Sequence, residues 1–183
     1  MENKELFLAT FELIKRPGKG NLLNYIESTD FFTAPASAKY HGAYPGGLVK
    51  HSLNVFKRMN AHGEFSAETL AIVSLLHDLC KADFYKIDYK NVKMANGTWK
   101  KEPYYAIEDT LPIGNHGDKS AFLISRFIPL TDEEYAAIRY HMGAFQEGDL
   151  RNIGKVYEKY PLAMFLHIAD MEATYLDEKR DIK

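Results

Sequence analysis

The residues of this chain that could do chemistry are histidines and acids that lie within apolar helical patterns. His77 and Asp78 end an apolar run that begins at Leu70. Asp170 interrupts the apolar stripe of a later segment, and His51 lies at the border of an earlier one. Burying an acid without a partner is costly, whereas neutral imidazoles and carboxylates together suit borderline transition metals. Because the pattern recurs in three separate segments, we expect these side chains to form a metal site.

Each of these residues alone also has a structural explanation. A histidine beside an apolar stripe can be a satisfied core residue, Asp170 could pair with an arginine, and His77–Asp78 could be a helix end that meets solvent. Lys81 has two interpretations of the same kind. On a helix it lies one turn after His77 on the same face, where it could neutralise charge on a phosphate. It could also be a solvated lysine that favours the helix dipole.

The elements that must position these side chains are mostly helices, as the spacing of apolar residues indicates. Ser66 and Asp118 are expected N-caps, and Thr131 opens a capping box. Pro161 is expected at a first helical position. We predict a mainly α fold that forms one domain over residues 1–183, with N-terminal helices in 1–29 and a core over 30–177. The expected helices cover about residues 6–14, 22–26, 48–63, 66–81, 118–127, 131–141 and 161–177.

Residues 84–107 change character and predict a β-hairpin inserted in the helical domain. Apolar residues alternate there as on a strand, and Asn96–Gly97 is a signal for a type I′ turn. Lysines are interleaved with tyrosines and a tryptophan, a pattern that can hold phosphates and stack bases. The alternative is a solvated strand face over an aromatic core. Because the hairpin directly follows Lys81, we expect it beside the pocket, with Lys86 as a substrate contact.

Composition excludes several classes of protein. Of the 183 residues, 46% are hydrophobic and 26% are charged, which is typical of a globular protein and excludes disorder, a collagen-like fibre and a disulfide scaffold. The net charge of −2 provides no overall positive field for binding bulk nucleic acid. Apolar stretches are too short for a membrane span. The single cysteine, Cys80, favours a reducing cytoplasm, and the oligomeric state has no signal in the sequence.

The order His51, His77–Asp78 and Asp170 resembles the HD superfamily of metal-dependent phosphohydrolases. The surrounding residues agree with the resemblance over roughly residues 30–177. Residues 44–51 (YPGGLVKH) resemble its GGL-x-x-H segment, residues 76–81 (LHDLCK) its HD-[IL]-x-K signature, and residues 166–170 (LHIAD) its closing H-x-A-D. Ala34-Pro35-Ala36 with His41 resembles the lead-in of the HD domain in a bacterial 3′–5′ exoribonuclease, although there is no room here for that enzyme's OB domain. The fold implied is an HD-domain helical bundle.

The resemblance also bears on the number of metal ions. Family members with two ions add two histidines between the His-Asp pair and the last Asp, and this chain has His116 and His141 in that interval. Asp78 would then bridge the ions. The alternatives are that His141 is a cation at a helix C-terminus and that His116 only lies in a loop. His167 is expected to pack beside the site. Iron or manganese is the expected metal, with nickel, zinc, magnesium or cobalt also possible.

The activity implied is hydrolysis of a phosphate ester or diester in a nucleotide or a short oligonucleotide. Lys81 and Asp78 would take part in catalysis, and His41 would contact the substrate. Two other functions stay open. Some relatives with a similar cage and two irons are oxygenases, and others bind a nucleotide without turnover and signal through a partner. The order of the motifs does not name the substrate.

Overall fold

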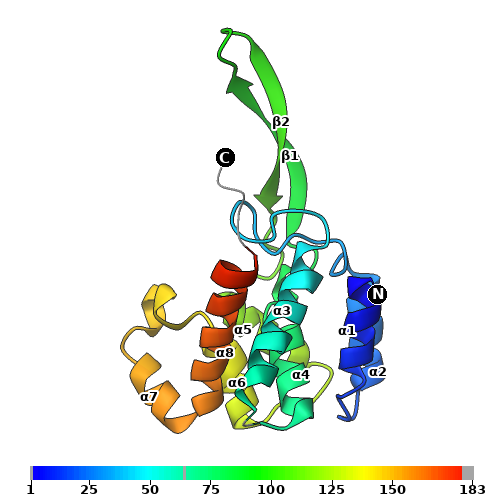
Figure 1. The fold of residues 1–183 in the computed structure, drawn as a ribbon, viewed down its shortest axis with the longest axis vertical. Coiled ribbons are helices and arrows are strands. Elements are labelled where there is room, and N and C mark those ends of the chain that lie inside the picture. Colours follow the sequence, from blue (N-terminus) through cyan, green and yellow to red (C-terminus); the bar gives the residue numbers. More distant parts are fainter. Residues whose placement is uncertain (1, 64, 179–183) are drawn as a thin grey trace.

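The computed structural model describes residues 2–63 and 65–178. Its order of elements confirms a mainly α chain with one inserted hairpin (Figure 1). Two 3₁₀ turns follow α6, and a π-helical turn continues α8 to Asp177. The elements are α1 (Asn3–Phe11), α2 (Lys19–Ser28), α3 (Gly47–His62), α4 (Ala67–Leu76), β1 (Tyr85–Lys93), β2 (Trp99–Ile107), α5 (His116–Ser125), α6 (Asp132–Tyr140), α7 (Ile153–Lys159) and α8 (Pro161–Glu172).

The core forms where α3 and α4 pack against α1, α6 and α8. α4 carries seven consecutive buried residues from Leu70 to Leu76, so it is covered on all sides. Phe7 and Phe11 of α1 are fully buried and stack at 5.8 Å, which joins the N-terminal helices to the same core. Burial of this apolar surface is the main term that holds the helices together. Within the described residues, no helix is long and apolar enough to cross a membrane.

Helix caps in the structure agree with the sequence at two sites and differ at a third. The hydroxyl of Ser66 accepts the Thr69 N–H at 3.1 Å, and Thr131 forms the expected capping box with Glu134. Asp118 was expected as an N-cap, but Asn115 caps α5, and the helix begins at His116. Asp118 instead accepts the Asn115 N–H from the third helical position. Either side chain can cap a helix, so composition alone placed the start three residues late.

The helix after Ser66 is shorter than expected, and this changes the surroundings of Lys81. α4 ends at Leu76, Asp78 leaves the helical region with φ −109° and ψ 21°, and a 3₁₀ turn covers Leu79–Lys81. Lys81 is therefore not on the same helix as His77. The first helix also ends earlier than expected, at Phe11, and α7 had no counterpart among the expected helices.

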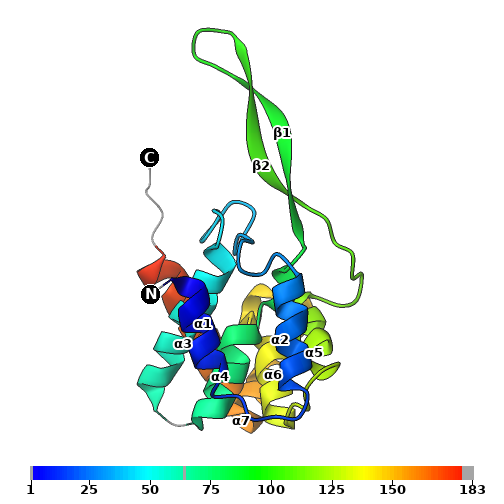
Figure 2. The ribbon, with the colours of Figure 1, turned by 90° about the vertical axis from the view of Figure 1, so that its right-hand side faces the viewer.

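The hairpin extends away from the helices as an arm (Figures 1 and 2). β1 and β2 pair antiparallel from Tyr85–Ile107 at the base to Lys93–Trp99 at the tip. The expected type I′ turn is wrong, because Gly97 has φ 82° while Asn96 has no positive φ. The Gly97 N–H bonds to the Met94 carbonyl, and the loop is a turn that ends in a left-handed glycine. The alternative of a solvated strand face over an aromatic core is also wrong, since Tyr89 is 61% exposed and Trp99 is 67% exposed.

Candidate metal centre

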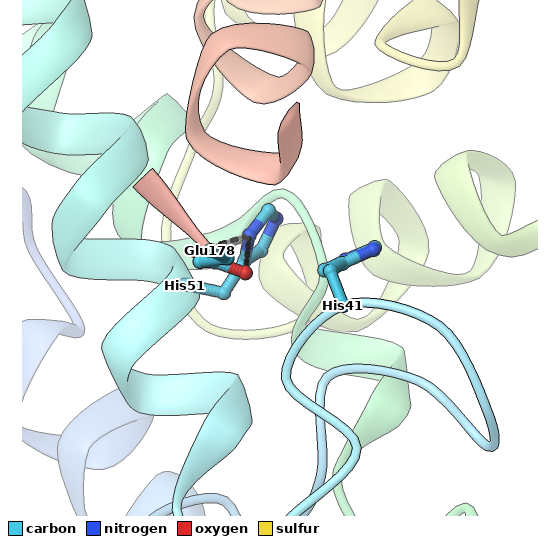
Figure 3. Close-up of side chains that lie close together, drawn as sticks. All are labelled: His41, His51 and Glu178. Carbon is cyan, nitrogen blue, oxygen red and sulfur yellow. Dashed lines mark hydrogen bonds and ion pairs between the residues drawn. The ribbon is translucent and has the colours of Figure 1, made fainter. Parts of the chain in front are cut away.

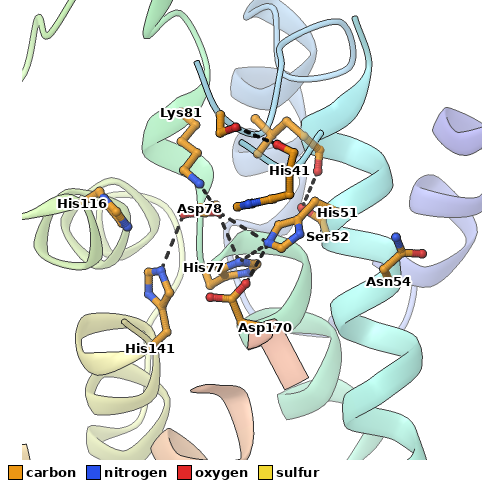
Figure 4. A network of polar contacts seen from close by, with 12 residues as sticks. His41, His51, Ser52, Asn54, His77, Asp78, Lys81, His116, His141 and Asp170 are labelled. Atoms are coloured by element: carbon orange, nitrogen blue, oxygen red, sulfur yellow. Dashed lines mark hydrogen bonds and ion pairs between the residues drawn. The ribbon is translucent and has the colours of Figure 1, made fainter. Parts of the chain in front are cut away.

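The six predicted metal ligands come from five segments and meet at one end of the helices (Figure 4). The positions follow from where helices begin and end. His51 lies in α3, His77 is the C-cap of α4 with Asp78 after it, and His141 is the C-cap of α6. His116 is the first residue of α5 and Asp170 lies in α8. Together with His41 and Glu178, these side chains form four overlapping groups of three residues. Within each group, one donor atom from each residue lies within 4.8 Å of the others.

The first half of the centre is built around two facing imidazoles. His77 Nε2 lies 3.3 Å from His51 Nε2 and 3.4 Å from Asp78 Oδ2. The other nitrogen of His77, Nδ1, donates to the Ser74 carbonyl at 2.9 Å, so Nε2 carries a lone pair directed at His51. His51 Nε2 also lies 3.1 Å from Asp170 Oδ1. A proton or a metal cation satisfies such a convergence of lone pairs and carboxylates.

The second half of the centre holds donor atoms that have no partner. Asp78 Oδ1, His116 Nε2 and His141 Nε2 are buried, and none has a hydrogen bond within the described residues. His141 Nδ1 donates to the Ile138 carbonyl at 2.7 Å, which leaves its Nε2 lone pair facing Asp78 Oδ1 at 3.6 Å. An unpaired buried polar atom costs about 1–3 kcal/mol. Three such atoms within 4.8 Å of one another fit a divalent cation.

Electrostatics hold His116 and Asp78 in the form that a metal requires, whereas neighbouring carboxylates raise the pKa of His51 and of His141, so a metal would have to displace a proton from His51. Burial lowers the pKa of His116 to about 3, so its imidazole is neutral at physiological pH. Burial raises the pKa of Asp78, but the charges of Lys81 and His77 outweigh burial and hold that pKa well below its usual range. Neutral imidazoles and ionised carboxylates are the ligand forms of a divalent metal.

Lys81 lies beside the metal centre and not in solvent. Its ammonium donates to Asp78 Oδ2 at 2.7 Å, and its side chain is only 12% exposed. Burial lowers the pKa of Lys81, but the charge of Asp78 outweighs it and raises the pKa, so the side chain stays cationic. The solvated helix-end alternative is therefore wrong. A fixed positive charge stands at the edge of the candidate metal site.

Glu178 is the residue of this centre that sequence reasoning missed (Figure 3). Its carboxylate lies 3.1 Å from His51 Nδ1 and accepts Asn54 Nδ2 at 2.8 Å. Burial lowers the pKa of His51, but Asp170 and Glu178 outweigh burial and raise the pKa to about 10. A carboxylate on the far nitrogen of a histidine is a typical support for a metal ligand. The sequence could have indicated Glu178, because it follows Asp170 by about two helical turns and so lies near the same face of a continued helix.

The other predicted contacts divide between the centre and the arm. The ring of His41 lies 4.8 Å from that of His51, and burial lowers the pKa of His41 to about 4. His167 Nδ1 donates to the His141 carbonyl at 2.7 Å, consistent with packing beside the site. Lys86 is exposed on the hairpin and pairs with Glu108 at 2.7 Å. Its role as a substrate contact stays a prediction.

Removing the charge of Glu178 should weaken metal binding without removing a ligand. We expect Glu178→Gln to bind Mn²⁺ about 10–100-fold more weakly, because the partner of a metal-bound histidine fixes its orientation and basicity. Isothermal titration calorimetry with Mn²⁺ measures the change. The matched control is Asp177→Asn, since Asp177 pairs with Arg58 outside the centre. Equal affinities of Glu178→Gln and the wild type would contradict this positioning role.

Comparisons with known proteins give no match to this chain among family models, curated proteins or solved structures. The assignment of a function therefore rests on the residues themselves and on the geometry of the centre.

Proposed function

We propose that this chain is an HD-type metal-dependent phosphohydrolase that cleaves a phosphate ester or diester of a nucleotide or oligonucleotide. One observation carries the proposal. Three buried donor atoms, on Asp78, His116 and His141, have no hydrogen-bond partner in the described part of the chain and lie next to the facing imidazoles of His51 and His77. Asp78 belongs to both sets, with Oδ2 toward one and Oδ1 toward the other. This arrangement is consistent with a carboxylate shared by two cations.

The residues divide into ligands for two metal ions. His51, His77, Asp78 and Asp170 would hold one ion, and Asp78, His116 and His141 would hold the second. Divalent ions in such a site supply Lewis acidity toward phosphoryl oxygens and lower the pKa of water into the neutral range. Histidine and carboxylate ligands suit iron and manganese. Zinc, nickel, cobalt and magnesium are the alternatives that a metal analysis would separate.

Lys81 supplies a positive charge that phosphoryl chemistry can use. A cationic side chain held within hydrogen-bonding distance of Asp78 can meet the negative charge that develops on a phosphoryl group. His41, half-buried and neutral above a pKa of about 4, lies at the same end of the centre and can donate or accept a hydrogen bond from a substrate oxygen.

The direct test combines metal analysis with a substrate panel. The purified full chain is analysed for metals by mass spectrometry, then loaded with Mn²⁺ or Fe²⁺ and assayed on a chromogenic phosphodiester, nucleotides and short oligonucleotides. We expect hydrolysis that chelation stops. An iron-dependent absorption band with O₂ consumption and no phosphate-ester cleavage would instead identify an oxygenase. Tight nucleotide binding without turnover under every metal would identify a binding domain.

Metal stoichiometry separates the one-ion and two-ion forms of the proposal. We expect the Mn²⁺-loaded wild type to hold about two ions and His141→Ala to hold about one. The first set of ligands does not include His141, so it still forms a site in this variant. Mass spectrometry of the metal and protein in one sample gives the ratio. A wild type that saturates at one ion would refute the second site and leave the first unaffected.

A further inference from the structure

The two faces of the hairpin differ in chemistry. Residues paired across an antiparallel ladder point to the same face, and alternate pairs point to opposite faces. The pairs Tyr85–Ile107, Ile87–Tyr105, Tyr89–Pro103, Asn91–Lys101 and Lys93–Trp99 therefore share one face, which we name the aromatic face. The opposite face, which we name the polar face, carries Lys86, Asp88, Lys90 and Glu102.

The aromatic face is exposed along most of its length. Ile87 is 63% exposed, Tyr89 is 61% and Trp99 is 67%. Both views show the outer part of the hairpin standing clear of the described helices (Figures 1 and 2). A two-stranded hairpin is at best marginally stable by itself, and burying an apolar face offsets that weakness. The chemistry of this face should therefore match the partner that covers it.

Charge identifies the partner as a polyanion. Within the ladder, the aromatic face carries two of the arm's lysines and no acid, and both acids lie on the polar face. Residues 85–107 together contain five lysines and two acids, whereas the whole chain has a net charge of −2. The arm is thus positive and the rest of the chain is negative. The aromatic face combines rings with lysines near the tip, where Lys93 and Lys101 flank Trp99. Rings that stack on bases, together with cations that follow a backbone, are the features that bind single-stranded nucleic acid.

The aromatic face leads to the metal centre. Its first residue, Tyr85, is half-buried at the base of the arm and follows Lys81 by four positions in the chain. Lys81 in turn donates to Asp78 Oδ2 at 2.7 Å. The Tyr85 and Tyr105 rings contact each other with centroids 6.3 Å apart, so the face is continuous at this end. From Tyr85 to Lys93 the strand spans about 26 Å, the length of about eight stacked nucleotides.

We infer that the aromatic face of the hairpin binds a single-stranded oligonucleotide and directs it to the metal centre. The inference deepens the proposed function and rests on it for the cleavage step, while binding to the arm is independent of cleavage. Sequence preference is expected to be low, because rings stack on every base and lysines contact the backbone. On the polar face, Lys86 pairs with Glu108 and Tyr104 donates to Asp88, so the bases are expected to stack on the aromatic face.

The test measures binding without turnover. Fluorescence anisotropy follows fluorescein-labelled DNA and RNA single strands of about 12 nucleotides, a length within the range of known single-strand sites. The full chain is kept in chelator so that no cleavage occurs, and a duplex of the same sequence is the comparison. We expect both single strands to bind more tightly than the duplex. Affinity should fall with salt, with a slope of about −0.7 for each phosphate contact.

Matched variants on the two faces decide whether the aromatic face is responsible. We expect Tyr89→Ala to weaken single-strand binding by about 10-fold or more, while Tyr104→Ala on the polar face changes it little. Lys101→Ala should reduce the salt slope by about 0.7. Its neighbour Lys100, which pairs with Val92 on the polar face, provides the control Lys100→Ala. These residues are all on the arm, so circular dichroism of each variant should match the wild type.

The outcomes separate this inference from the proposed function. Oligonucleotide binding that depends on Tyr89, with no hydrolysis of any phosphodiester after metal loading, would support binding by the aromatic face and refute the proposed hydrolase activity. Hydrolysis of a chromogenic phosphodiester with no single-strand binding would do the reverse. Equal losses from variants of both faces would also overturn the inference. So would a dimer in sedimentation experiments that Tyr89→Ala dissociates while no oligonucleotide binds, because the face would then join two copies of the chain.

Discussion

His77→Ala should leave the protein without tightly bound metal. His77 belongs to two of the four candidate ligand groups, one with His51 and Asp78 and one with His141 and Asp170. Its Nε2 lies 3.3 Å from His51 Nε2, and its Nδ1 is held by the Ser74 carbonyl. Its loss therefore removes a ligand from the middle of the centre.

The consequence for stability follows from linkage, because a metal that binds only the folded chain stabilises it. At about 100 times the dissociation constant the gain is about 2.7 kcal/mol. For a chain of this size, that corresponds to about 5–10 °C in melting temperature. We expect chelation to lower the melting temperature of the wild type by that amount and to leave His77→Ala unchanged. Thermal unfolding with and without EDTA, together with metal analysis, measures both effects.

A second histidine provides the control for this experiment. His62→Ala removes an imidazole from the end of α3, where the ring lies against Phe165 and outside every candidate ligand group of the described residues. This variant should keep its metal and respond to chelator as the wild type does. His77→Asn retains polar volume and guards against simple unfolding of the alanine variant. Full metal occupancy in both His77 variants would refute the ligand assignment.

Lys81→Ala should reduce phosphohydrolase turnover by about 10²–10³-fold while the protein keeps its metal. An ammonium is repelled by a dication, so Lys81 is not a ligand. Its ammonium lies 2.7 Å from Asp78 Oδ2, so under the proposed function it would meet a phosphoryl group bound beside that carboxylate. Losing one charge-stabilising contact in a dry site typically has an effect of this size. Lys81→Arg keeps the charge and should lose less, although its planar group differs in geometry.

The matched control for Lys81 is another buried lysine with an acid partner. Lys119 has a side chain only 8% exposed and pairs with Asp109, which belongs to no candidate ligand group of the described residues. Lys119→Ala should therefore alter stability but not the turnover of the folded enzyme. Steady-state kinetics on the best substrate of the panel, with metal content measured in the same samples, provides the comparison. Unchanged kinetics in Lys81→Ala would mean that substrate phosphate is held elsewhere, by His41 or the hairpin lysines.

Patterns along the chain were sufficient to predict the helical class, the hairpin and the helices that carry the candidate ligands. The spacing of apolar residues and the capping of helices are local properties. The sequence therefore predicted, within one residue, the bounds of α3 (Gly47–His62) and the start of α6 after Thr131. Residue types alone also singled out the buried acids, because an unpaired carboxylate in an apolar stripe needs a partner. Where two residues can cap, as at Asn115 and Asp118, local preference does not choose between them.

Only the tertiary structure decided which of these side chains meet. The convergence of Asp78 with His116 and His141 depends on how α5 and α6 pack against the end of α4, and packing is not a local property. Lys81 pairs with Asp78 from a 3₁₀ turn that follows the end of α4 at Leu76, a stop that apolar periodicity does not show. Glu178 reaches His51 across 127 positions of sequence. The exposure of the aromatic face also depends on the absence of a covering element among the described residues, which no pattern within the strands reveals.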